Sequence, residues 1–347
     1  MSDPIPRPDA LAHGAAASRQ RTLTKPADAL GRLEELACWF AARQGRGIPV
    51  ALVPAITVFA ADHGVAARGV SAYPAEVTAQ MVANFARGGA AINVLARHLG
   101  ARLTVVDAGV AAPLSGLEGV VHAKIRAGSR DLATEPALTA DEVAAAQALG
   151  AARAAADVAA GANLLIAGDM GIGNTTAAAC LVCALTGESA DDIVGAGTGI
   201  DATARSRKVA IVASAVSRAR SHAGADGWRW LAYVGGLEIA AIAGYQHAAA
   251  ARGVPMLLDG FVATAAALAV RAIAPRAVDW MLASHRSAER GHGRALRHLG
   301  LEPLVDLGMR LGEGSGAAVV VPLLQAALAL HAGMATFTDA RVTGPAR

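Results

Sequence analysis

Cysteine, lysine and aromatic residues are scarce in this 347-residue chain. Its three cysteines, Cys38, Cys180 and Cys183, are too few for a disulfide framework. Cys180 and Cys183 form a C-x-x-C pair, but the pair lies in an apolar helical run with no second cysteine or histidine pair nearby. Two small core side chains are therefore favoured over a metal or redox site. This cysteine usage fits a reduced, cytoplasmic compartment.

Long uninterrupted hydrophobic runs are also missing, although 54% of the residues are hydrophobic and the mean hydropathy is +0.40. The most apolar run, residues 317–337, is interrupted by Pro322, Gln325 and His331, and residues 261–274 are too few to span a bilayer. A spanning helix needs roughly 20 clean apolar residues. The N-terminus shows no basic segment followed by an apolar core. We therefore expect buried helices, no membrane span and no secretory signal.

Blocks of basic residues are absent as well. The net charge is +3, with 28 arginines but only three lysines, and these residues are scattered along the sequence. Aromatic residues make up only 3% of the chain and do not alternate with basic ones, as they do on many nucleic-acid-binding surfaces. The composition argues against nucleic-acid binding and leaves small anionic ligands open.

After an N-terminal helical region, short β-rich runs alternate with alanine-rich helical runs. Lys25 and Pro26 mark the expected start of a first helix with Leu36 and Phe40 on one face. Such alternation is typical of a parallel sheet with helices on both faces. We predict an α/β fold with a parallel sheet of about six strands flanked by helices, in a Rossmann-like three-layer arrangement. The predicted strands lie within residues 55–64, 102–110, 163–171, 255–260, 279–287 and 303–309.

Polar residues follow each predicted strand. Asp and Ser after a strand often only start a turn or cap the next helix. In open α/β sheets, however, ligands bind beyond the carboxyl ends of the strands. Taken as a set, the polar residues predict one composite site at that edge. They are Asp62, His63, Asp107, Asp169, Asp259, Ser284, His285 and Asp306.

Residues 167–185 read as a strand, a glycine loop and a helix. The loop would present backbone N–H groups and hydroxyls at a helix N-terminus, which suits one phosphate. It lacks the lysine of a Walker A motif and has no ribose-binding acid downstream, so a dinucleotide is not expected. The alternative is a tight turn with a threonine cap. The loop residues are Gly171, Gly173, Asn174, Thr175 and Thr176.

Two more glycine-rich stretches are candidates for binding an anion. Residues 194–210 hold a glycine loop followed by three cations, which suits an anion as well as it suits a loop before a solvated basic helix. Residues 310–318, R-L-G-E-G-S-G-A-A, lead into an apolar helix but have Glu313 where an anion would be expected. The first of these loops contains Gly195, Gly197, Gly199, Arg205, Arg207 and Lys208.

Other single residues have two interpretations. His63 could act as a general base, but a structural role at the edge of the core is favoured. Tyr73, Met81 and Phe85 could line an apolar ligand pocket, although such side chains at helical spacing more often form simple core. The sequence has no H-E-x-x-H, paired-cysteine, D-x-D-x-D or G-x-S-x-G motif. We therefore expect metal-free chemistry without a covalent serine intermediate.

Nine segments together resemble one enzyme family. They read TKPADALGRLEELA, FAADHGV, GVSAYPAEVTAQMVANFARGGAAIN, VVDAG, GDMGIGNTT, GTGID, LLDGFVATAAAL, SHRSAERGH and LGLEPLVDLGMRLGEGSGAA. They follow this order from Thr24 to Ala318, so the likeness covers nearly the whole chain. With them, the chain resembles the nicotinate-nucleotide–dimethylbenzimidazole phosphoribosyltransferases, which make the lower-ligand nucleotide of cobalamin.

The resemblance implies transfer of ribose 5-phosphate from nicotinate mononucleotide to 5,6-dimethylbenzimidazole, giving α-ribazole 5′-phosphate and nicotinate, without a cofactor or metal. It implies that Glu313 is the catalytic base, that Asp169 belongs to the catalytic site, and that Ser287 reaches the site of the partner subunit in a homodimer. The phosphate-binding residues it implies are Gly171, Asn174, Thr175, Thr176, Gly197 and Lys208. The base-pocket residues it implies are Tyr73, Gln80, Met81, Met170 and Leu311.

The resemblance also implies a small helical domain built from both chain ends, residues 1–50 and 318–347, beside a large α/β catalytic domain of residues 51–317. Two positions depart from the family. Asp169 stands where the family often has glutamate, and Ala196 stands where it often has arginine, so a cationic contact is lost. Neither departure replaces the base or the phosphate loop.

Two rival functions fit parts of the sequence. A transferase using phosphoribosyl pyrophosphate would show paired acids before a turn, to hold Mg²⁺ and pyrophosphate, whereas residues 102–110 contain the single acid Asp107. A non-catalytic carrier of benzimidazole-like ligands could use the same fold. Such a carrier would not need Glu313, which is present.

Overall fold

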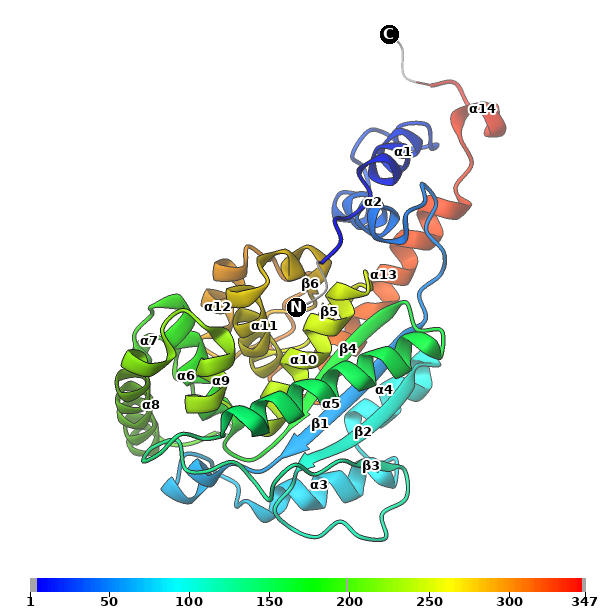
Figure 1. Ribbon diagram of the computed structural model, residues 1–347. Helices are drawn as coiled ribbons and strands as arrows, with labels where there is room; N and C mark the ends of the chain where they lie inside the picture. Colours follow the sequence, from blue (N-terminus) through cyan, green and yellow to red (C-terminus); the bar gives the residue numbers. More distant parts are fainter. Residues whose placement is uncertain (1–4, 198, 345–347) are drawn as a thin grey trace.

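The structure, a computed structural model, describes residues 5–197 and 199–344. It shows an α/β body with a smaller helical bundle at one end (Figure 1). The strands in the described residues are β1 (Pro54–Ala61), β2 (Arg102–Gly109), β3 (Val120–His122), β4 (Leu164–Met170), β5 (Met256–Leu258) and β6 (Met281–Ala283). They form one parallel sheet in the order β3-β2-β1-β4-β5-β6.

Strand β1 lies at the centre of the sheet and is buried along its whole length. Ile56 and Val58 belong to the core on one face, and Ala55 and Phe59 belong to the core on the other. This is the period-two alternation of a strand. Both faces need apolar side chains because helices cover both.

Helices cover the sheet on both sides (Figure 1). On one face lie α3 (Glu76–Ala86), α4 (Ala91–Leu99) and α13 (Ser315–Gly333). On the other face, α10 (Leu237–Ala251) and α11 (Phe261–Ile273) contact the strands. Around these two helices lie α5 (Ala140–Ala159), α6 (Asn174–Thr186), α7 (Ala190–Ile193), α8 (Ala202–Ala223), α9 (Gly227–Val234) and α12 (His292–Leu299). Two 3₁₀ helices complete the body, η1 (Gly64–Arg68) and η2 (Pro275–Trp280).

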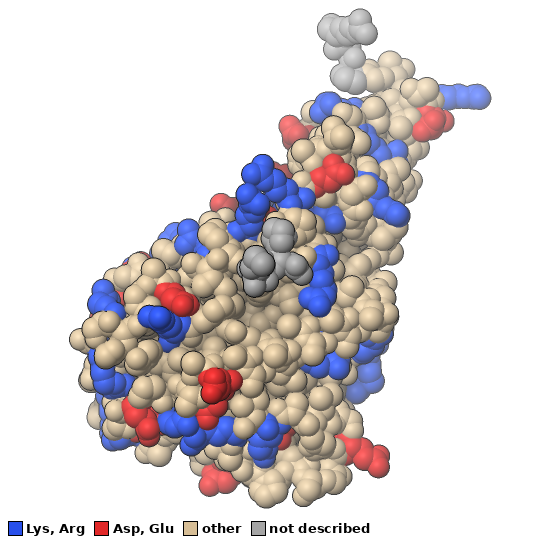
Figure 2. Space-filling model, in the orientation of Figure 1, with Lys and Arg blue, Asp and Glu red and all other residues tan. Residues whose placement is uncertain are grey.

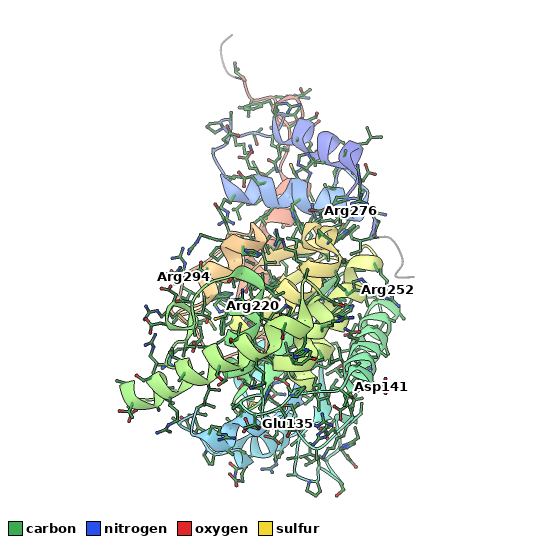
Figure 3. The ribbon with its side chains drawn as sticks, turned by 60° about the vertical axis from the view of Figure 1, so that its left-hand side comes forward. Glu135, Asp141, Arg220, Arg252, Arg276 and Arg294 are labelled. Atoms are coloured by element: carbon green, nitrogen blue, oxygen red, sulfur yellow. The ribbon has the colours of Figure 1, made fainter. Side chains whose placement is uncertain are left out.

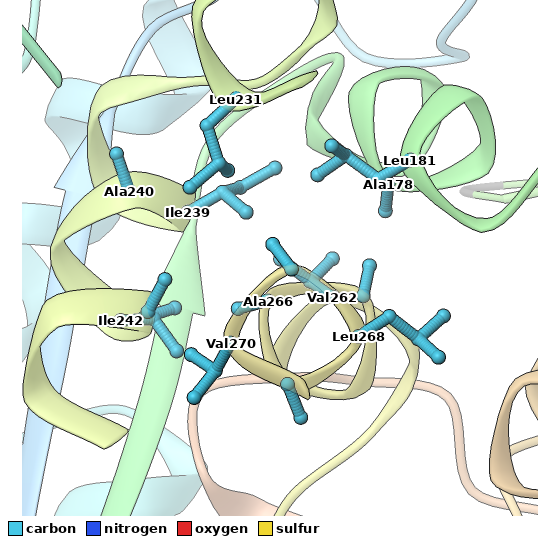
Figure 4. Close-up of a cluster of buried hydrophobic side chains, with 14 of the residues drawn as sticks. Ala178, Leu181, Leu231, Ile239, Ala240, Ile242, Val262, Ala266, Leu268 and Val270 are labelled. Carbon is cyan, nitrogen blue, oxygen red and sulfur yellow. The ribbon is translucent and has the colours of Figure 1, made fainter. Parts of the chain in front are cut away.

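Helix α11 runs through the core beside the sheet. Figure 4 shows apolar side chains of α6, α9, α10 and α11 gathered in one cluster, among them Leu181, Leu231, Ile239 and Val262. All residues of α11 from Phe261 to Val270 are buried. Close packing of this kind fixes the position of the helix and of its first turn.

The predicted α/β fold with a parallel six-stranded sheet is confirmed, but one predicted strand is wrong. Residues 303–309 do not form a strand, and only an isolated bridge joins Val305 to His285. Pro303 has no N–H to donate, and β6 offers only three residues for pairing. The sixth strand is β3, an edge strand of three residues beside β2, which is too short to show a period in the sequence.

The predicted start of the first long helix is also wrong. That helix, α2 (Arg32–Gln44), begins several residues after Lys25 and Pro26. Asp28 (φ 57°) and Gly31 (φ 52°) have left-handed backbone, which a right-handed helix excludes. Leu36 and Phe40 are buried, as their spacing predicted.

Helices from both chain ends pack together at one end of the molecule (Figure 1). Helix α1 (Ala10–Gln20) packs on α2, α2 packs on α13, and α14 (Phe337–Ala340) follows α13. Arg19 Nε donates to the carbonyl of His331 (2.8 Å), and Leu23 bridges to Thr336. Helix α13 runs without a break through residue 317, so the division into domains at residues 50 and 317 stays a prediction. Residues 1–4 and 345–347 of the predicted terminal domain lie outside the described residues.

Of the helices that the structure describes, α13 alone is long and apolar enough to cross a membrane. Half of that apolar stretch is buried, and the helix contacts α2, α4 and β4. Its position within the fold is that of a core helix, which joins the terminal bundle to the carboxyl edge of the sheet.

Candidate active site

A cavity of about 610 Å³ opens at the carboxyl edge of the sheet. The loops after β4, β5 and β6 and the loop before α13 line it, so it collects segments far apart in the sequence. All the site residues that the resemblance implies line the cavity except Gln80, Thr176 and Lys208. A larger cavity of about 1190 Å³ lies between α1, α2 and the C-terminal segment, but none of the predicted site residues line it.

Glu313 lies in a loop with left-handed backbone at three consecutive residues, Gly312 (φ 85°), Glu313 (φ 65°) and Gly314 (φ 86°). Glycine adopts such angles readily, whereas glutamate needs surrounding contacts to hold it there. The Glu313 N–H donates to the carbonyl of Asp169 (3.3 Å). The loop also lies against Gly168, where a Cβ would overlap the backbone of Glu313. Strand β4 thus sets the position of the Glu313 carboxylate.

The Glu313 side chain is buried and has a free oxygen. The residue is 4% exposed, and its Oε2 has no hydrogen-bond partner among the described residues. Burial raises the pKa of Glu313 to about 7, with the charge of Asp259 adding to the rise and a backbone hydrogen bond from Ile92 opposing it. A carboxyl group with this pKa exchanges a proton near neutral pH. It is therefore suited to accept a proton from a bound ligand.

Asp169 stands beside the Glu313 loop at the end of β4. Its Oδ2 accepts a hydrogen bond from Nδ2 of Asn174 (2.7 Å). Burial raises the pKa of Asp169 well above its usual range, and the charges of Asp259, Glu238 and Glu313 raise it further. Asp169 thus links the end of β4 to the Glu313 loop and to Asn174 at the start of α6.

Asp259 serves as the cap of α13. It accepts the N–H groups of Gly314 and Ala317, both at 3.0 Å. The positive N-terminal end of α13 is therefore occupied by a carboxylate of this chain. The glycine-rich loop around Glu313 is for this reason a poor site for a phosphate.

Helix α6, in contrast, has Gly173 as its N-cap residue and no side-chain cap. Lys208 Nζ donates to Thr175 Oγ1 (2.7 Å) in its first turn, and Thr176 Oγ1 is buried without a partner among the described residues. Lys208 is 1% exposed; burial lowers its pKa to about 8, while the charge of Glu289 acts in the opposite direction. An uncapped helix start with hydroxyls and a buried cation suits a phosphate group.

Gly197 lies next to the ammonium group of Lys208. A Cβ at Gly197 would be 3.2 Å from both Lys208 Nζ and Thr175 Oγ1. Arg310 donates from its guanidinium to the Gly197 carbonyl, which ties the second glycine loop to the Glu313 loop. Thr198, the next residue of that loop, lies outside the described residues.

Ser287 lines the cavity of its own chain. Its N–H donates to His292 Nδ1 (2.8 Å), and its Oγ accepts the N–H of Glu289 (3.3 Å). A single chain thus already brings Ser287 to the site. A contribution of Ser287 to the site of a partner subunit stays a prediction.

The predicted base-binding residues differ in their placement. Tyr73 and Leu311 are exposed at the mouth of the cavity, and Met81 and Met170 are half-buried in its wall. Gln80 is exposed and does not line the cavity. The wall available to a flat ring is therefore mostly apolar.

The composite site predicted from the strand ends is correct in part. Asp169 and His285 line the cavity, and Asp259 lies behind it through its contact with Gly314. The other three acids do not belong to the site. Asp62 and Asp107 accept N–H groups of a loop, and Asp306 faces solvent.

His63 has the structural role favoured from the sequence. Its Nε2 lies 2.6 Å from Glu238 Oε1, and both side chains are fully buried. Burial lowers the pKa of His63, but the charge and hydrogen bond of Glu238 outweigh it and raise the pKa. The pair joins the end of β1 to the start of α10 and does not line the cavity. Phe85 is likewise a core residue.

Glu289, Arg310 and the first turn of α11 also line the cavity, although the sequence did not predict them there. Arg310 stands three residues before Glu313 in the same glycine-rich stretch, so this stretch was its only signal. Glu289 and residues 260–262 reach the cavity through the packing of α12 and α11, which no local pattern reveals.

Cys180 and Cys183 are free and buried in α6, as expected for core side chains. Burial raises the pKa of Cys183 to about 12. Within residues 5–197 and 199–344, no group of three or more His, Cys, Asp or Glu side chains could hold a metal ion.

On the face shown in Figure 2, basic and acidic groups alternate among uncharged ones. Arg220, Arg252, Arg276 and Arg294 project from different parts of the body in Figure 3. Arg294 is itself paired with acids on α7 and in the loop before it. On the face shown in Figure 2, the basic groups do not form one continuous patch.

Comparison with known proteins agrees with the geometry. A family model described as Phosphoribosyltransferase matches residues 5–342. The nicotinate-nucleotide–dimethylbenzimidazole phosphoribosyltransferase of Chromobacterium violaceum is 59% identical over 336 residues, which is 97% of each chain. The enzyme of the same name from Mycobacterium tuberculosis is 54% identical over 342 residues, 98% of this chain and 94% of the relative.

A solved structure shows the same fold. The crystal structure of the Thermus thermophilus nicotinate-nucleotide–dimethylbenzimidazole phosphoribosyltransferase superposes with a TM-score of 0.92 at 46% identity, covering 97% of this chain and all of that one. Family match, identity and fold agree over nearly the full length. The chain therefore belongs to the nicotinate-nucleotide–dimethylbenzimidazole phosphoribosyltransferase family.

Proposed function

We propose that this chain transfers the ribose 5-phosphate of nicotinate mononucleotide to 5,6-dimethylbenzimidazole. The products are α-ribazole 5′-phosphate, for the lower ligand of cobalamin, and nicotinate. The observation that carries this proposal is the buried Glu313 carboxylate, with a free oxygen and a pKa of about 7, in the same cavity as an uncapped helix start. The names of the relatives support it.

Glu313 acts as a general base in this proposal. A neutral benzimidazole has one ring nitrogen with a lone pair and another that carries N–H. As the first attacks C1′ of the ribose, positive charge grows on the ring, and a carboxylate bonded to the N–H stabilises this charge and takes the proton. The C1′–N bond to nicotinate breaks at the same time, and its electron pair returns to the pyridinium ring. In-line attack on a β-nucleotide inverts C1′ and gives the α product.

The first turn of α6 holds the 5′-phosphate in this proposal. Thr175, Thr176 and the buried Lys208 converge there, and Gly197 covers them. Fixing the ribose phosphate and the acceptor ring in one geometry can contribute roughly 7–11 kcal/mol to the lowering of the barrier. Since the leaving group is already a pyridinium, no acid is required on that side.

Asp169 and the apolar wall have supporting roles. Asp169, whose pKa is raised by burial, connects the base loop to the phosphate loop through Asn174. Tyr73, Met81, Met170 and Leu311 cover the faces of the acceptor ring, with Gln80 farther out. We further propose a homodimer and a cytoplasmic location, as the sequence predicted.

The function is tested with the purified chain, nicotinate mononucleotide and 5,6-dimethylbenzimidazole in EDTA. Mass spectrometry should detect α-ribazole 5′-phosphate and an equal amount of nicotinate. If product formed only with phosphoribosyl pyrophosphate and Mg²⁺, the chain would instead be a transferase that uses phosphoribosyl pyrophosphate. Tight binding of the benzimidazole without any product would show a carrier.

A further inference from the structure

The loop that joins β4 to α6 is held by two neighbouring elements. This β4–α6 loop consists of residues 171–173, and its last residue, Gly173, is the N-cap residue of α6. Gly171 and Ile172 line the cavity, although Ile172 is only 5% exposed. The position of the loop therefore sets the position of the proposed phosphate site at the start of α6.

The end of β1 lies against the β4–α6 loop. A Cβ on Gly171 would overlap the carbonyl of Ala61, and a Cβ on Gly173 would be 3.2 Å from the Cβ of His63. His63 is itself fixed by its buried ion pair with Glu238 (2.6 Å). Because this region is closely packed, the loop cannot move toward β1 without displacing buried groups.

Helix α3 supplies the second contact through Thr78. The Ile172 N–H donates to Thr78 Oγ1 (3.1 Å), and Thr78 is 0% exposed. Thr78 does not line the cavity. A buried backbone N–H without a partner is costly, so the Thr78 hydroxyl stabilises this conformation of the loop.

Helix α3 also forms part of the cavity wall. Val77 and Met81 line the cavity and stand four residues apart, on one face of the helix. Met81 is one of the residues proposed to cover the acceptor ring. Since Thr78 directly follows Val77, the same turn of α3 carries both the wall for the acceptor ring and the contact with the β4–α6 loop.

We propose that Thr78 is a positioning residue that fixes the distance between the acceptor ring on α3 and the ribose phosphate at the start of α6. Its hydroxyl keeps C1′ of the donor within reach of the attacking ring nitrogen without contacting either substrate. This inference rests on the proposed function, because that function supplies both substrates. A misplacement of about 1 Å can cost roughly 10²-fold in rate.

Thr78→Val tests the inference because it removes the hydroxyl and keeps the shape of the side chain. We expect kcat to fall by about 10- to 100-fold. The Kd values of ribose 5-phosphate and of 5,6-dimethylbenzimidazole, each measured alone by calorimetry, should stay close to those of the wild type, since each half of the site is intact. Thr78→Ser keeps the hydroxyl and should have a kcat near the wild-type value.

Thr57→Val is the matched control. Thr57 is also 0% exposed, and its hydroxyl donates to Asp157 Oδ2 (2.9 Å), but neither residue lines the cavity. We expect Thr57→Val to lower the Tm and to leave kcat per folded molecule unchanged. Thr78→Ala, which lacks the hydroxyl but leaves space around it, carries the same test if Thr78→Val does not fold.

Several results would overturn the inference. One is a wild-type kcat in folded Thr78→Val, and another is a loss of kcat that Thr78→Ser shares or that Thr57→Val matches. Weaker binding of ribose 5-phosphate with unchanged kcat would also count against it, because Thr78 would then support the phosphate site alone. Failure of the proposed function looks different, since the wild type itself would then form no α-ribazole 5′-phosphate.

Discussion

The residues around Glu313 determine the position and the pKa of its carboxyl group. Its neighbours Gly312 and Gly314 let the backbone turn, Gly168 lets the loop lie on β4, and Asp259 holds the next helix in place. The result is a buried carboxyl group with a raised pKa and a free oxygen. A glutamate in an exposed loop would have neither property.

Glu313→Gln should lower kcat by about 10²- to 10⁴-fold, since the amide cannot take the proton. KM for nicotinate mononucleotide should stay close to the wild-type value because the phosphate site is untouched. Steady-state kinetics with the mass-spectrometric product assay measure both constants. A kcat near that of the wild type would remove Glu313 from the mechanism.

The same variant should change the pH dependence of stability. The pKa of Glu313 rises from an ordinary 4.5 to about 7 on folding, so the folded state binds more protons than the unfolded state between these values. Its favourable contribution is complete below pH 4.5 and is lost as the pH rises through about 7. We expect Glu313→Gln to have a higher Tm than the wild type at about pH 8 but not at about pH 5. Equal Tm differences at the two pH values would contradict the raised pKa.

The pH profile of kcat/KM should be bell-shaped. Activity should rise through about pH 7 as Glu313 ionises, and fall above about pH 8 as the buried Lys208 loses its charge in the free enzyme. Glu313→Gln should lose the rising limb. Lys208→Ala should raise KM for the nucleotide at neutral pH and lose the falling limb. A falling limb that persists in Lys208→Ala would assign it to another group.

At the scale of elements, four segment ends meet at one edge of the sheet. The end of β4 supports the Glu313 loop, the start of α6 is the proposed phosphate site, and the start of α11 lines the cavity at Gly260. The start of α13 is closed by Asp259. We therefore expect a phosphate at the start of α6 and not at the start of α13.

Gly168→Ala should test how β4 positions the base. The added Cβ overlaps the backbone of Glu313, so the loop must move away. A displacement of about 1 Å can cost roughly 10²-fold in rate, and we expect a loss of kcat of this size with a smaller change in KM. Gly14→Ala in α1, where nothing lies within 4 Å of the added atom, is the control and should keep full activity. Circular dichroism of both variants should match the wild type; full activity of Gly168→Ala would contradict the contact.

At the scale of the whole molecule, α13 links two regions. Its first turn follows the Glu313 loop, and its later turns pack on α2 in the bundle built from both chain ends (Figure 1). None of the bundle's described residues lines the cavity at the sheet edge.

Mixing two impaired variants should show whether sites are shared between subunits. If Ser287 serves the partner's site, a heterodimer of Glu313→Gln with Ser287→Ala contains one site with both native residues, and activity recovers. The placement of Ser287 in the cavity of its own chain leads us to expect no recovery. Native mass spectrometry would verify that heterodimers form, and recovered activity in that mixture would support the shared site predicted from the sequence.

The sequence alone determined the alternation of strands and helices, the glycine loops and the identity of the family. These signals are local: a buried strand is a continuous apolar run, and a loop that approaches a ligand needs glycine. Five of the predicted strands are present for this reason. The three-residue β3 left no periodic signal. The mostly apolar run at residues 303–309 resembled a strand but has no partner strand long enough to pair with.

Only the tertiary structure decided which of these local features could do chemistry. It made Asp259 a helix cap, His63 half of a buried ion pair, and Glu313 a buried acid with a free oxygen. It also brought the start of α11 against His285 and Ser287. Burial and charge proximity depend on which distant segments pack together, and both the pKa of a side chain and the vacancy of a helix start follow from that packing.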